Sequence, residues 1–287
     1  MKLAIGLALG GVVFASSVAA QAALPAPQFI EANNVSLRYQ LIGTSGPVVV
    51  LIHEMGISLE SWDDVLPYIE PGHRILRYDL PGFGLSEKLR APITMDDEVQ
   101  DLAALLDGLG IQGKVTVVGS AAGGAIALAF AAAHPERTNA VIAFCPAAYP
   151  ATNPRGMAMA DSIAKAPLAK YVLGGTNIVY PADLRKDPAR FARFESLEMA
   201  TDPVSLSITY HMIEATAFAG ILPKISVPAE IVGVSQFKAH SPAQLKALSQ
   251  MIPGGRFEQI DSGHFSPYES PELVGPLLRR FLASVGG

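Results

Sequence analysis

The chain has 287 residues, of which 50% are apolar and 16% charged, with a formal net charge of -5 and a single cysteine. The apolar fraction excludes intrinsic disorder, and the lone cysteine excludes a disulfide scaffold. The weak negative charge excludes the basic surface typical of nucleic-acid-binding proteins, and the length suits one large α/β domain or two smaller ones.

The first 22 residues have the pattern of a secretory signal peptide. Lys2 provides a positive start, residues 3–18 are apolar apart from two serines, and Ala20-Gln21-Ala22 forms a small-residue cleavage motif. The fully apolar part is shorter than the roughly 20 residues that a membrane-spanning helix needs, which favours a cleaved signal over an anchor. We therefore predict an exported, periplasmic protein without a stable membrane anchor.

Apolar runs alternate with helical patterns along the rest of the chain. Segments 48–52, 115–118, 141–144 and 231–233 are short and bounded by turn residues, which is typical of buried parallel strands. Helices are expected after Thr94, after the strand at 115–118 and after Ser270. The opening segments 29–32 and 35–42 are expected to pair as antiparallel strands. This alternation predicts an α/β fold with a mostly parallel sheet.

Residues 147–222 depart from this rhythm, because they show helical patterns and no strand signal. We predict that they form a helical cap, inserted into a core built from residues 23–146 and 223–287. The segment is rich in methionine and aromatic residues, many of which can form the cap's own core. Those that face the sheet would cover a pocket at the strand ends, where α/β proteins bind their ligands.

The most specific motif is Gly-Ser-Ala-Ala-Gly at residues 119–123, between an expected strand and an expected helix. A strand, a sharp turn and a helix are the context of the nucleophile elbow, G-x-S-x-G. Its glycines are needed because side chains there would collide with adjacent strands. The start of the following helix supplies a backbone N–H that can stabilise an oxyanion.

Three further segments, 51–56, 78–86 and 261–265, follow expected strands in the corresponding order. With the motif at 119–123, they make the chain resemble the α/β-hydrolase superfamily over nearly all its mature length. It looks most like the enol-lactonase, esterase and C–C-bond hydrolase branch with a helical cap. The resemblance implies about eight strands, oxyanion N–H groups at Met55 and Ala122, a catalytic histidine at His264, and a small, largely apolar ester or lactone as substrate.

The catalytic residues that the resemblance implies are incomplete. The nucleophile position holds Ala121, which has no nucleophilic atom, and Ser120 lies one residue early, so that its side chain should point elsewhere. The acid position falls near Gln236, and neither 231–257 nor 137–160, which contains the alternative acid position, has an Asp or Glu. Two coordinated absences favour a natural departure over an engineered serine-to-alanine change.

Glu54 stands beside the expected oxyanion loop, where members of this superfamily usually have glycine. A carboxylate there would repel the charge that the oxyanion site holds. Two interpretations are open. The side chain either faces outward, solvated or ion-paired, or it is a buried carboxyl with a raised pKa that forms an acid–base couple with His264.

Other candidates have ordinary structural interpretations. His53 is expected to bond its own loop, and Cys145 to be a buried, unreactive thiol. Asp261 is expected to bond backbone near the histidine, and His240 to be solvated on a loop. The sequence contains no H-E-x-x-H motif, paired His/Cys ligand spacing or phosphate-cradling glycine loop, so neither a metal nor a nucleotide cofactor is expected.

Three functions are compatible with these residues. The first is hydrolysis by an unusual catalyst, such as Ser120 with His264. The second is a nucleophile-free lyase or isomerase, in which His264 moves protons with help from Glu54. The third is a ligand-binding protein that has kept the pocket and lost the chemistry. Each takes a small apolar organic molecule and no nucleic acid as partner, and the oligomeric state is left open.

Overall fold

The computed structural model describes residues 26–286. The predicted signal peptide at residues 1–22 lies outside this range, so export stays a prediction. Within the described range, no helix is long and apolar enough to cross a membrane.

An eight-stranded sheet forms the centre of the fold, in the order β1-β2-β4-β3-β5-β6-β7-β8. β1 and β2 pair as the expected antiparallel hairpin, β2 also pairs antiparallel with β4, and the other pairs are parallel. The expected α/β-hydrolase fold is thereby confirmed. The strands are β1 (Gln28–Ala32), β2 (Val35–Ile42), β3 (Val48–Ile52), β4 (Arg74–Tyr78), β5 (Val115–Ser120), β6 (Thr138–Phe144), β7 (Ala229–Val234) and β8 (Arg256–Ile260).

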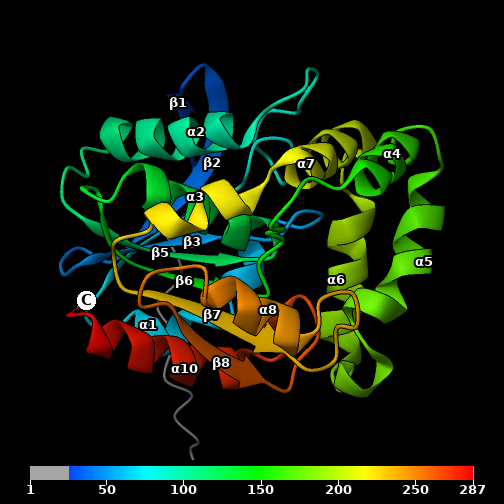
Figure 1. Ribbon diagram of the computed structural model, residues 1–287. Coiled ribbons are helices and arrows are strands. Elements are labelled where there is room, and N and C mark those ends of the chain that lie inside the picture. The colour runs from blue at the N-terminus through cyan, green and yellow to red at the C-terminus, as the bar shows by residue number, and fades with distance from the viewer. Residues whose placement is uncertain (1–25, 287) are drawn as a thin grey trace, which may run out of the picture.

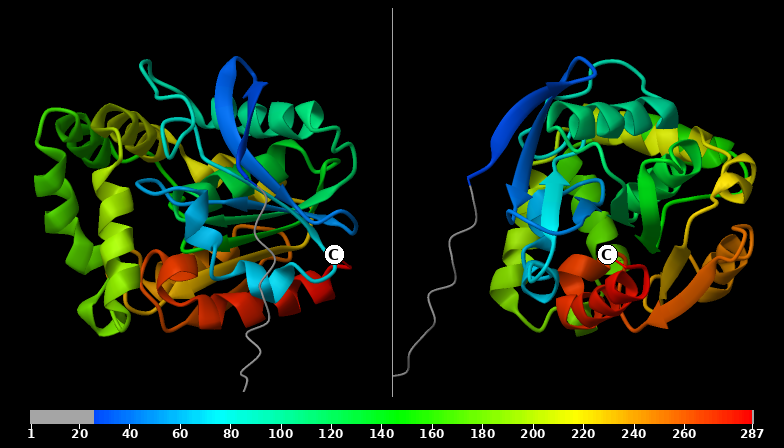
Figure 2. Two further views of the ribbon diagram at one scale, coloured as in Figure 1. Left: turned by 180° about the vertical axis from the view of Figure 1, so that it is seen from behind. Right: turned by 90° about the vertical axis from the view of Figure 1, so that its left-hand side faces the viewer.

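Helices cover both faces of the sheet (Figure 1 and Figure 2). On one face, α2, α3 and α8 pack their apolar side chains onto the sheet in the larger core cluster. On the other face, α1 and α10 form a second cluster. These elements and the short helices of the core are η1 (Leu59–Trp62), α1 (Leu66–Ile69), α2 (Met95–Gly108), α3 (Ala122–Ala133), η3 (Phe218–Gly220), η4 (Leu222–Lys224), α8 (Pro242–Ser249), α9 (Ser266–Glu269) and α10 (Pro271–Ser284).

Local signals explain where several of these elements begin. The expected cap of α2 is present, because Thr94 and Asp97 bond each other's backbone N–H groups. Ser241 and Gln244 form the same arrangement at α8. The strands β3, β5 and β7 are buried along their whole length, which accounts for their continuous apolar runs.

Between β6 and β7 the chain forms four longer helices, which we call the cap helices. They lie together beyond one end of the sheet (Figure 1 and Figure 2). The cap helices are α4 (Pro154–Ile163), α5 (Leu168–Val179), α6 (Pro188–Met199) and α7 (Pro203–Ala215), with the short η2 (Ala182–Leu184) between α5 and α6.

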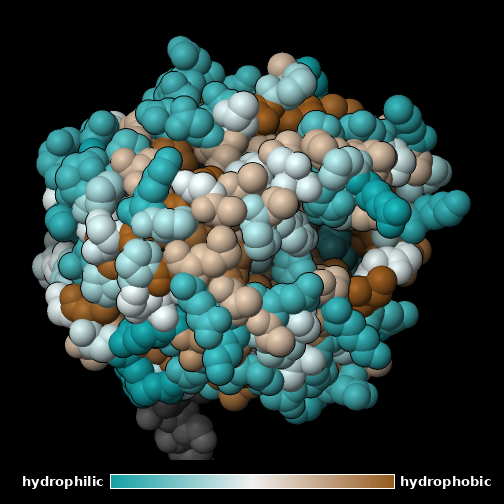
Figure 3. All heavy atoms as spheres, viewed as in Figure 1, coloured by the Kyte–Doolittle hydropathy of each residue, from teal (hydrophilic) through white to brown (hydrophobic). Residues whose placement is uncertain are grey.

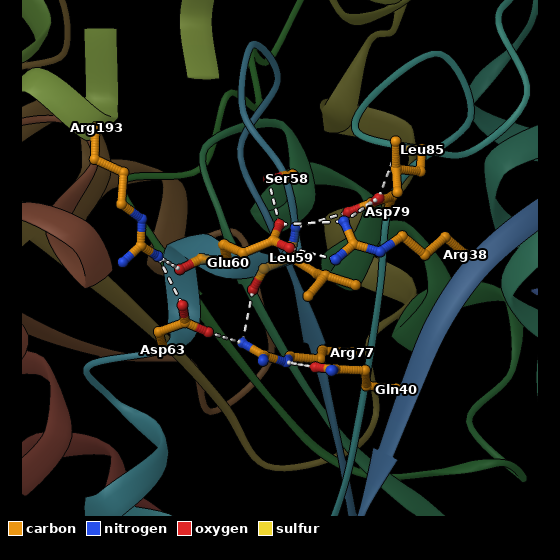
Figure 4. Close-up of polar contacts among 10 residues, drawn as sticks. All are labelled: Arg38, Gln40, Ser58, Leu59, Glu60, Asp63, Arg77, Asp79, Leu85 and Arg193. Atoms are coloured by element: carbon orange, nitrogen blue, oxygen red, sulfur yellow. Dashed lines mark hydrogen bonds and ion pairs between the residues drawn. The ribbon is translucent and has the colours of Figure 1, made fainter. Parts of the chain in front are cut away.

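Polar contacts fasten α6 to the core. Arg193 pairs with Asp63 at 2.7 Å, as Figure 4 shows, and Arg190 pairs with Asp64 at 3.0 Å. Just after the helix, Thr201 Oγ1 donates a hydrogen bond of 2.7 Å to the carbonyl oxygen of Gly56. The end of α6 is therefore held against the loop that follows β3.

The core side of this junction contains a buried ionic network centred on Asp79 (Figure 4). Its carboxylate accepts hydrogen bonds from the backbone N–H groups of Leu59 and Leu85, both at 2.8 Å, and from Arg38 at 3.0 Å. Arg38 also pairs with Glu60. Because Asp79 is fully buried and each of these donors reaches it, the network joins β2, the end of β4 and η1 into one unit.

We predict that Asp79→Ala lowers the free energy of unfolding by about 3–5 kcal/mol, because it removes the acceptor of a buried guanidinium and two backbone N–H groups. Glu258→Ala is the matched control, since its ion pair with Arg280 is exposed and such pairs contribute ~1 kcal/mol or less. Urea denaturation gives the free energy of unfolding of the parent and of both variants. An equal decrease of this free energy in the two variants would contradict the central role of Asp79.

Candidate functional site

The turn from β5 to α3 has no room for side chains on its flanks. A Cβ atom at Gly119 would overlap the backbone of Gly123, and one at Gly123 would overlap the carbonyl oxygens of Ile52 and His53 on the neighbouring strand end. Between these glycines, Ala121 has φ 48° and ψ -111°, a backbone conformation that residues with a side chain rarely adopt. The strained geometry of a nucleophile elbow is therefore present, with a methyl group at its apex.

A cavity of about 470 Å³ lies over this apex, between the sheet and the cap helices. Figure 3 shows the surface hollowed there, to the right of centre. Most of the wall is apolar or aromatic. Besides Ala121, the lining includes Met55 and Gly56 from the loop after β3, Tyr149, Tyr171, Tyr210 and Phe237 with aromatic rings, and Lys170, Glu198, His240 and His264 with titratable groups.

His264 lies on the cavity wall in the loop after β8. Its ring stacks on Phe237 with centroids 4.1 Å apart, and its Nδ1 lies 3.4 Å from Sγ of Cys145. Burial, with a smaller contribution from His240, lowers the pKa of His264 to about 3. The imidazole is therefore neutral at physiological pH, and the residue lines the cavity.

No carboxylate among residues 26–286 is bonded to His264. Gln236, at the expected acid position, turns instead to Asp261 and donates a hydrogen bond of 3.1 Å to its Oδ1. Asp261 is exposed and also accepts from the hydroxyl of Ser235. The expectation that Asp261 bonds backbone was wrong, because its carboxylate accepts hydrogen bonds from the side chains of Ser235 and Gln236 in the loop after β7.

Cys145 occupies the place beside Nδ1 that a triad carboxylate would take. It follows β6 with φ 40°, and its backbone N–H donates to the carbonyl oxygen of Val232 at 2.8 Å. Burial raises the pKa of the thiol, and the charge of Glu269 adds to this shift. The thiol is therefore neutral and unreactive, as the sequence suggested, and it can orient the His264 ring without stabilising a positive charge on it.

Glu54 is fully buried, so its side chain faces inward and is not solvated at the surface. Its carboxylate oxygens accept no hydrogen bond of good geometry within residues 26–286. Desolvation raises the pKa of Glu54 to about 7, and its own backbone N–H and the hydroxyls of Ser120 and Ser61 oppose this shift. Within residues 26–286 no hydrogen bond joins Glu54 to His264, and Glu54 is not among the groups that shift the pKa of His264.

Ser120, the last residue of β5, lies next to Glu54. Its side chain is completely buried, and its hydroxyl makes no hydrogen bond of good geometry among the described residues. Glu269 lies near enough for the charge of Glu54 to raise its pKa further, beyond the large effect of burial. Ser120 and Glu54 are therefore neighbours, and neither is among the residues that line the cavity.

His240 corrects a second expectation, since it is buried rather than solvated. Its Nε2 lies 2.8 Å from the hydroxyl of Tyr149, and its ring centroid is 6.4 Å from that of His264. Burial lowers the pKa of His240 to about 4. The loop after β7 packs against the segment after β6, a long-range contact that the isolated histidine in the sequence did not indicate.

The remaining expected residues occupy ordinary positions. The ring of His53 bonds its own loop as expected: Nε2 accepts from the N–H of Leu80 at 2.9 Å, so Nδ1 carries the proton and donates to the carbonyl oxygen of Glu54 at 2.6 Å. Met55 lines the cavity, and Ala122 is the first residue of α3. Within the described part of the chain, no three His, Cys, Asp or Glu side chains form a group that could hold a metal ion.

Sequence inspection missed Glu198, which lines the cavity from α6. Burial and the charge of Glu195 raise the pKa of Glu198 to about 8. Nothing in the helical pattern of this segment separated Glu198 from the other charged residues around it.

We predict that Glu54 makes the folded protein less stable as the pH rises from about 5 to about 7. Its pKa is raised to about 7 from the usual 4.5, so the folded state holds the proton more tightly and loses this advantage as the carboxyl ionises. Glu54→Gln should remove this dependence and be more stable than the parent at pH 8, by an amount of the order of 3 kcal/mol.

Denaturant unfolding at several pH values measures this effect. Glu258→Gln is the control, because the Glu258 side chain is 41% exposed. The control should follow the parent at every pH. If the free energy of unfolding of Glu54→Gln changes with pH as that of the parent does between pH 5 and pH 8, Glu54 is not a buried neutral carboxyl.

Known proteins resemble this chain over different lengths. A family model described as alpha/beta hydrolase fold matches residues 47–244. The 2-hydroxy-6-oxo-6-(2'-aminophenyl)hexa-2,4-dienoic acid hydrolase of Metapseudomonas resinovorans is 33% identical over 118 residues, which are 40% of each protein. The poly(3-hydroxyalkanoate) depolymerase of Ectopseudomonas oleovorans is 25% identical over 242 residues, 82% of this chain and 83% of that protein. The match to the first relative thus spans about two fifths of its length.

Solved structures match the fold more completely. The enol-lactonase from Burkholderia xenovorans superimposes with a TM-score of 0.84 at 25% identity, covering 89% of this chain and 100% of that one. The thermophilic esterase from Thermogutta terrifontis superimposes with a TM-score of 0.81 at 23% identity, covering 91% and 99%, and shows likeness of fold alone. With its eight-stranded sheet and strained turn, the chain belongs to the alpha/beta hydrolase fold family and resembles its small-molecule hydrolases.

Proposed function

We propose that the protein binds a small, largely apolar organic molecule in the cavity over Ala121 and does not attack it through a serine. The observation that carries this proposal is the apex of the turn. Ala121 has the strained backbone of a nucleophile position and lines the cavity, yet its side chain is a methyl group. A bound molecule would therefore meet an apolar floor where a covalent intermediate would otherwise form.

The surroundings of His264 support the same proposal. A serine mechanism needs a histidine that gains a proton and a carboxylate that stabilises the resulting cation. Here the neighbour of Nδ1 is the thiol of Cys145, and burial keeps the ring neutral. Ser120 is a poor substitute nucleophile, because it is fully buried beside Glu54 and is not among the residues that line the cavity.

The apolar wall supports the class of ligand. Aromatic rings and aliphatic side chains dominate the lining, and the cavity volume of about 470 Å³ suits a small organic molecule. Similar proteins include an enol-lactonase and a dienoic acid hydrolase, whose names denote small organic substrates. Because this chain shares their fold, we expect a ligand of comparable size.

Proton transfer without a nucleophile is the second candidate function. It is favoured by one specific observation, the neighbouring rings of His264 and His240 on the cavity wall. A neutral imidazole can accept a proton from a bound ligand, and the hydroxyl of Tyr149 lies beside His240. This function would appear as turnover that His264→Ala abolishes, whereas a binding protein returns its ligand unchanged.

We predict that phenylpropanol, an uncharged molecule with an apolar body, raises the melting temperature of the protein. A ligand at a hundred times its Kd stabilises the folded state by about 2.7 kcal/mol. Ala147→Leu should weaken this effect, because Ala147 lines the cavity and the larger side chain fills part of it. Ala192→Leu, at an exposed site on α6 outside the cavity lining, is the control.

Calorimetry gives the Kd for each variant, and mass spectrometry of the recovered ligand detects turnover. Binding that survives in Ala192→Leu but weakens in Ala147→Leu supports the proposal. An unchanged melting temperature in the parent, or equal binding by both variants, would contradict it.

We also predict that Ala121→Ser alone gains little esterase activity, less than about tenfold over the parent, because His264 still lacks a carboxylate. Adding Cys145→Asp should raise kcat/KM for nitrophenyl butyrate by a further factor of ten or so, since Asp would face Nδ1 and tolerates the φ of 40°. Cys145→Asp without the serine should stay inactive.

The test measures kcat/KM for nitrophenyl butyrate in the parent, the two single variants and the double variant, and circular dichroism checks that each is folded. A high rate in Ala121→Ser alone would mean that Ala121 is the only obstacle to hydrolysis and that another group supports His264.

A further inference from the structure

The carboxyl group of Glu198 enters the cavity from the cap, close to the loop after β3. Its Oε1 lies 3.8 Å from the position that a Cβ atom on Gly56 would take, and the residue lines the cavity with Met55 and Gly56. Although the residue as a whole is partly exposed, its Oε2 atom is buried. The carboxyl therefore faces the side of the cavity where the chain passes from β3 toward η1.

The protein holds Glu198 in this place through contacts on either side of it. Thr201, three residues later, donates its hydroxyl to the carbonyl oxygen of Gly56 at 2.7 Å. Arg193, five residues earlier, pairs with Asp63 at 2.7 Å, as Figure 4 shows. Because both contacts bind α6 to the core, the position of Glu198 over Gly56 is a built feature of the fold.

Glu198 has no partner for its charge in the described part of the chain. Its carboxylate forms no ion pair there, and its buried Oε2 accepts no hydrogen bond. Lys170 also lines the cavity, but it is exposed and makes no ion pair with Glu198. A desolvated carboxyl without a donor is costly. A ligand that brings its own positive N–H group would remove that cost.

The neighbouring wall is suited to a cation with an apolar body. Burial raises the pKa of Tyr171, and the charge of the nearby Glu198 adds to this shift. The rings of Tyr149, Tyr210 and Phe237 also line the cavity. Aromatic faces attract ammonium groups, and they pack equally well on a hydrocarbon chain. The two histidines do not oppose such a ligand, because burial keeps both rings uncharged at neutral pH.

We propose that Glu198 anchors the protonated amine of a ligand, whose apolar body extends across Ala121 toward His264. This inference rests on the proposed binding function and names the chemical class of the ligand, a primary amine with an aromatic or aliphatic body. The ammonium donates hydrogen bonds to the carboxylate beside Gly56, and the body occupies the aromatic part of the cavity. No covalent bond of the ligand forms or breaks, and the only proton released is that of the Glu198 carboxyl.

The proton balance distinguishes this ligand from an uncharged one. Burial raises the pKa of Glu198 to about 8, so the empty site holds a proton at neutral pH. An alkylamine, with a pKa near that of lysine at about 10.4, arrives as an ammonium ion. Binding therefore releases the carboxyl proton, and amine affinity should rise from pH 6 to pH 8 while that of a neutral ligand stays constant.

The test compares phenylpropylamine with phenylpropanol, which differ only in the group at the end of the chain. Calorimetry on the parent, Glu198→Gln and Glu195→Gln gives each Kd at pH 6 and pH 8, in two buffers of different ionisation enthalpy. Glu195→Gln is the matched control, because it removes a carboxyl from the same helix that does not line the cavity.

At pH 8 we expect Glu198→Gln to weaken phenylpropylamine binding by between about tenfold and a hundredfold, the range for loss of a charge-assisted hydrogen bond. Phenylpropanol should bind the variant and the parent alike, and Glu195→Gln should change neither affinity by more than about threefold. Proton release on amine binding should appear in the parent and vanish in Glu198→Gln.

Equal affinity of the parent for amine and alcohol would overturn the inference while leaving the binding function intact, as would unchanged amine binding by Glu198→Gln. Weaker binding of phenylpropanol by Glu198→Gln would indicate that the protonated carboxyl donates to an uncharged ligand oxygen, which also contradicts an amine anchor. If neither molecule binds the parent, the proposed function itself fails.

Discussion

The passage from β5 into α3 leaves no space for side chains at two positions. Gly119 lies against the backbone of Gly123, and Gly123 lies against the end of the neighbouring strand β3. This steric constraint determines which residues can take part in any chemistry. It turns Ala121 toward the cavity and places Ser120, only one residue earlier, in the interior. A shift of one residue on such a turn therefore exchanges a reactive position for a structural one. The strained backbone at Ala121 is present with a methyl group as its side chain.

The buried carboxyl groups differ in the donors that surround them. Asp79 accepts from two backbone N–H groups and from Arg38, so its charge is compensated where it lies. Glu54 is equally buried, but its oxygens have no partner of good geometry among residues 26–286, and burial raises its pKa. Glu198 shares the unpartnered state, with the difference that its carboxyl faces a cavity. The same functional group thus fixes the fold in one place, stays neutral in a second, and is available to a ligand in a third.

Patterns local in the sequence were sufficient to predict the alternation of strands and helices, the cap of α2 at Thr94, and the sharp turn at 119–123. Each depends on neighbours within a few residues. The burial of His240 and the direction of Gln236 could not be predicted, because they depend on contacts with Tyr149 and Asp261 from distant segments. Glu198 is the clearest case. Its role depends on how α6 is fastened to the core, and helical periodicity carries no information about that long-range contact.

Cys145, beside Nδ1 of His264, and Ala121, at the apex of the turn, affect the same chemistry. In a serine hydrolase, the carboxylate beside the histidine stabilises the imidazolium that forms when the nucleophile gives up its proton. Here burial raises the pKa of the Cys145 thiol and lowers that of His264, so both groups are uncharged at neutral pH. Their contact can orient the ring but cannot support a charge on it. An uncharged ring, stacked on Phe237 beside a methyl group, costs little to bury under an apolar ligand. The residues at the two positions therefore both support the proposed binding function.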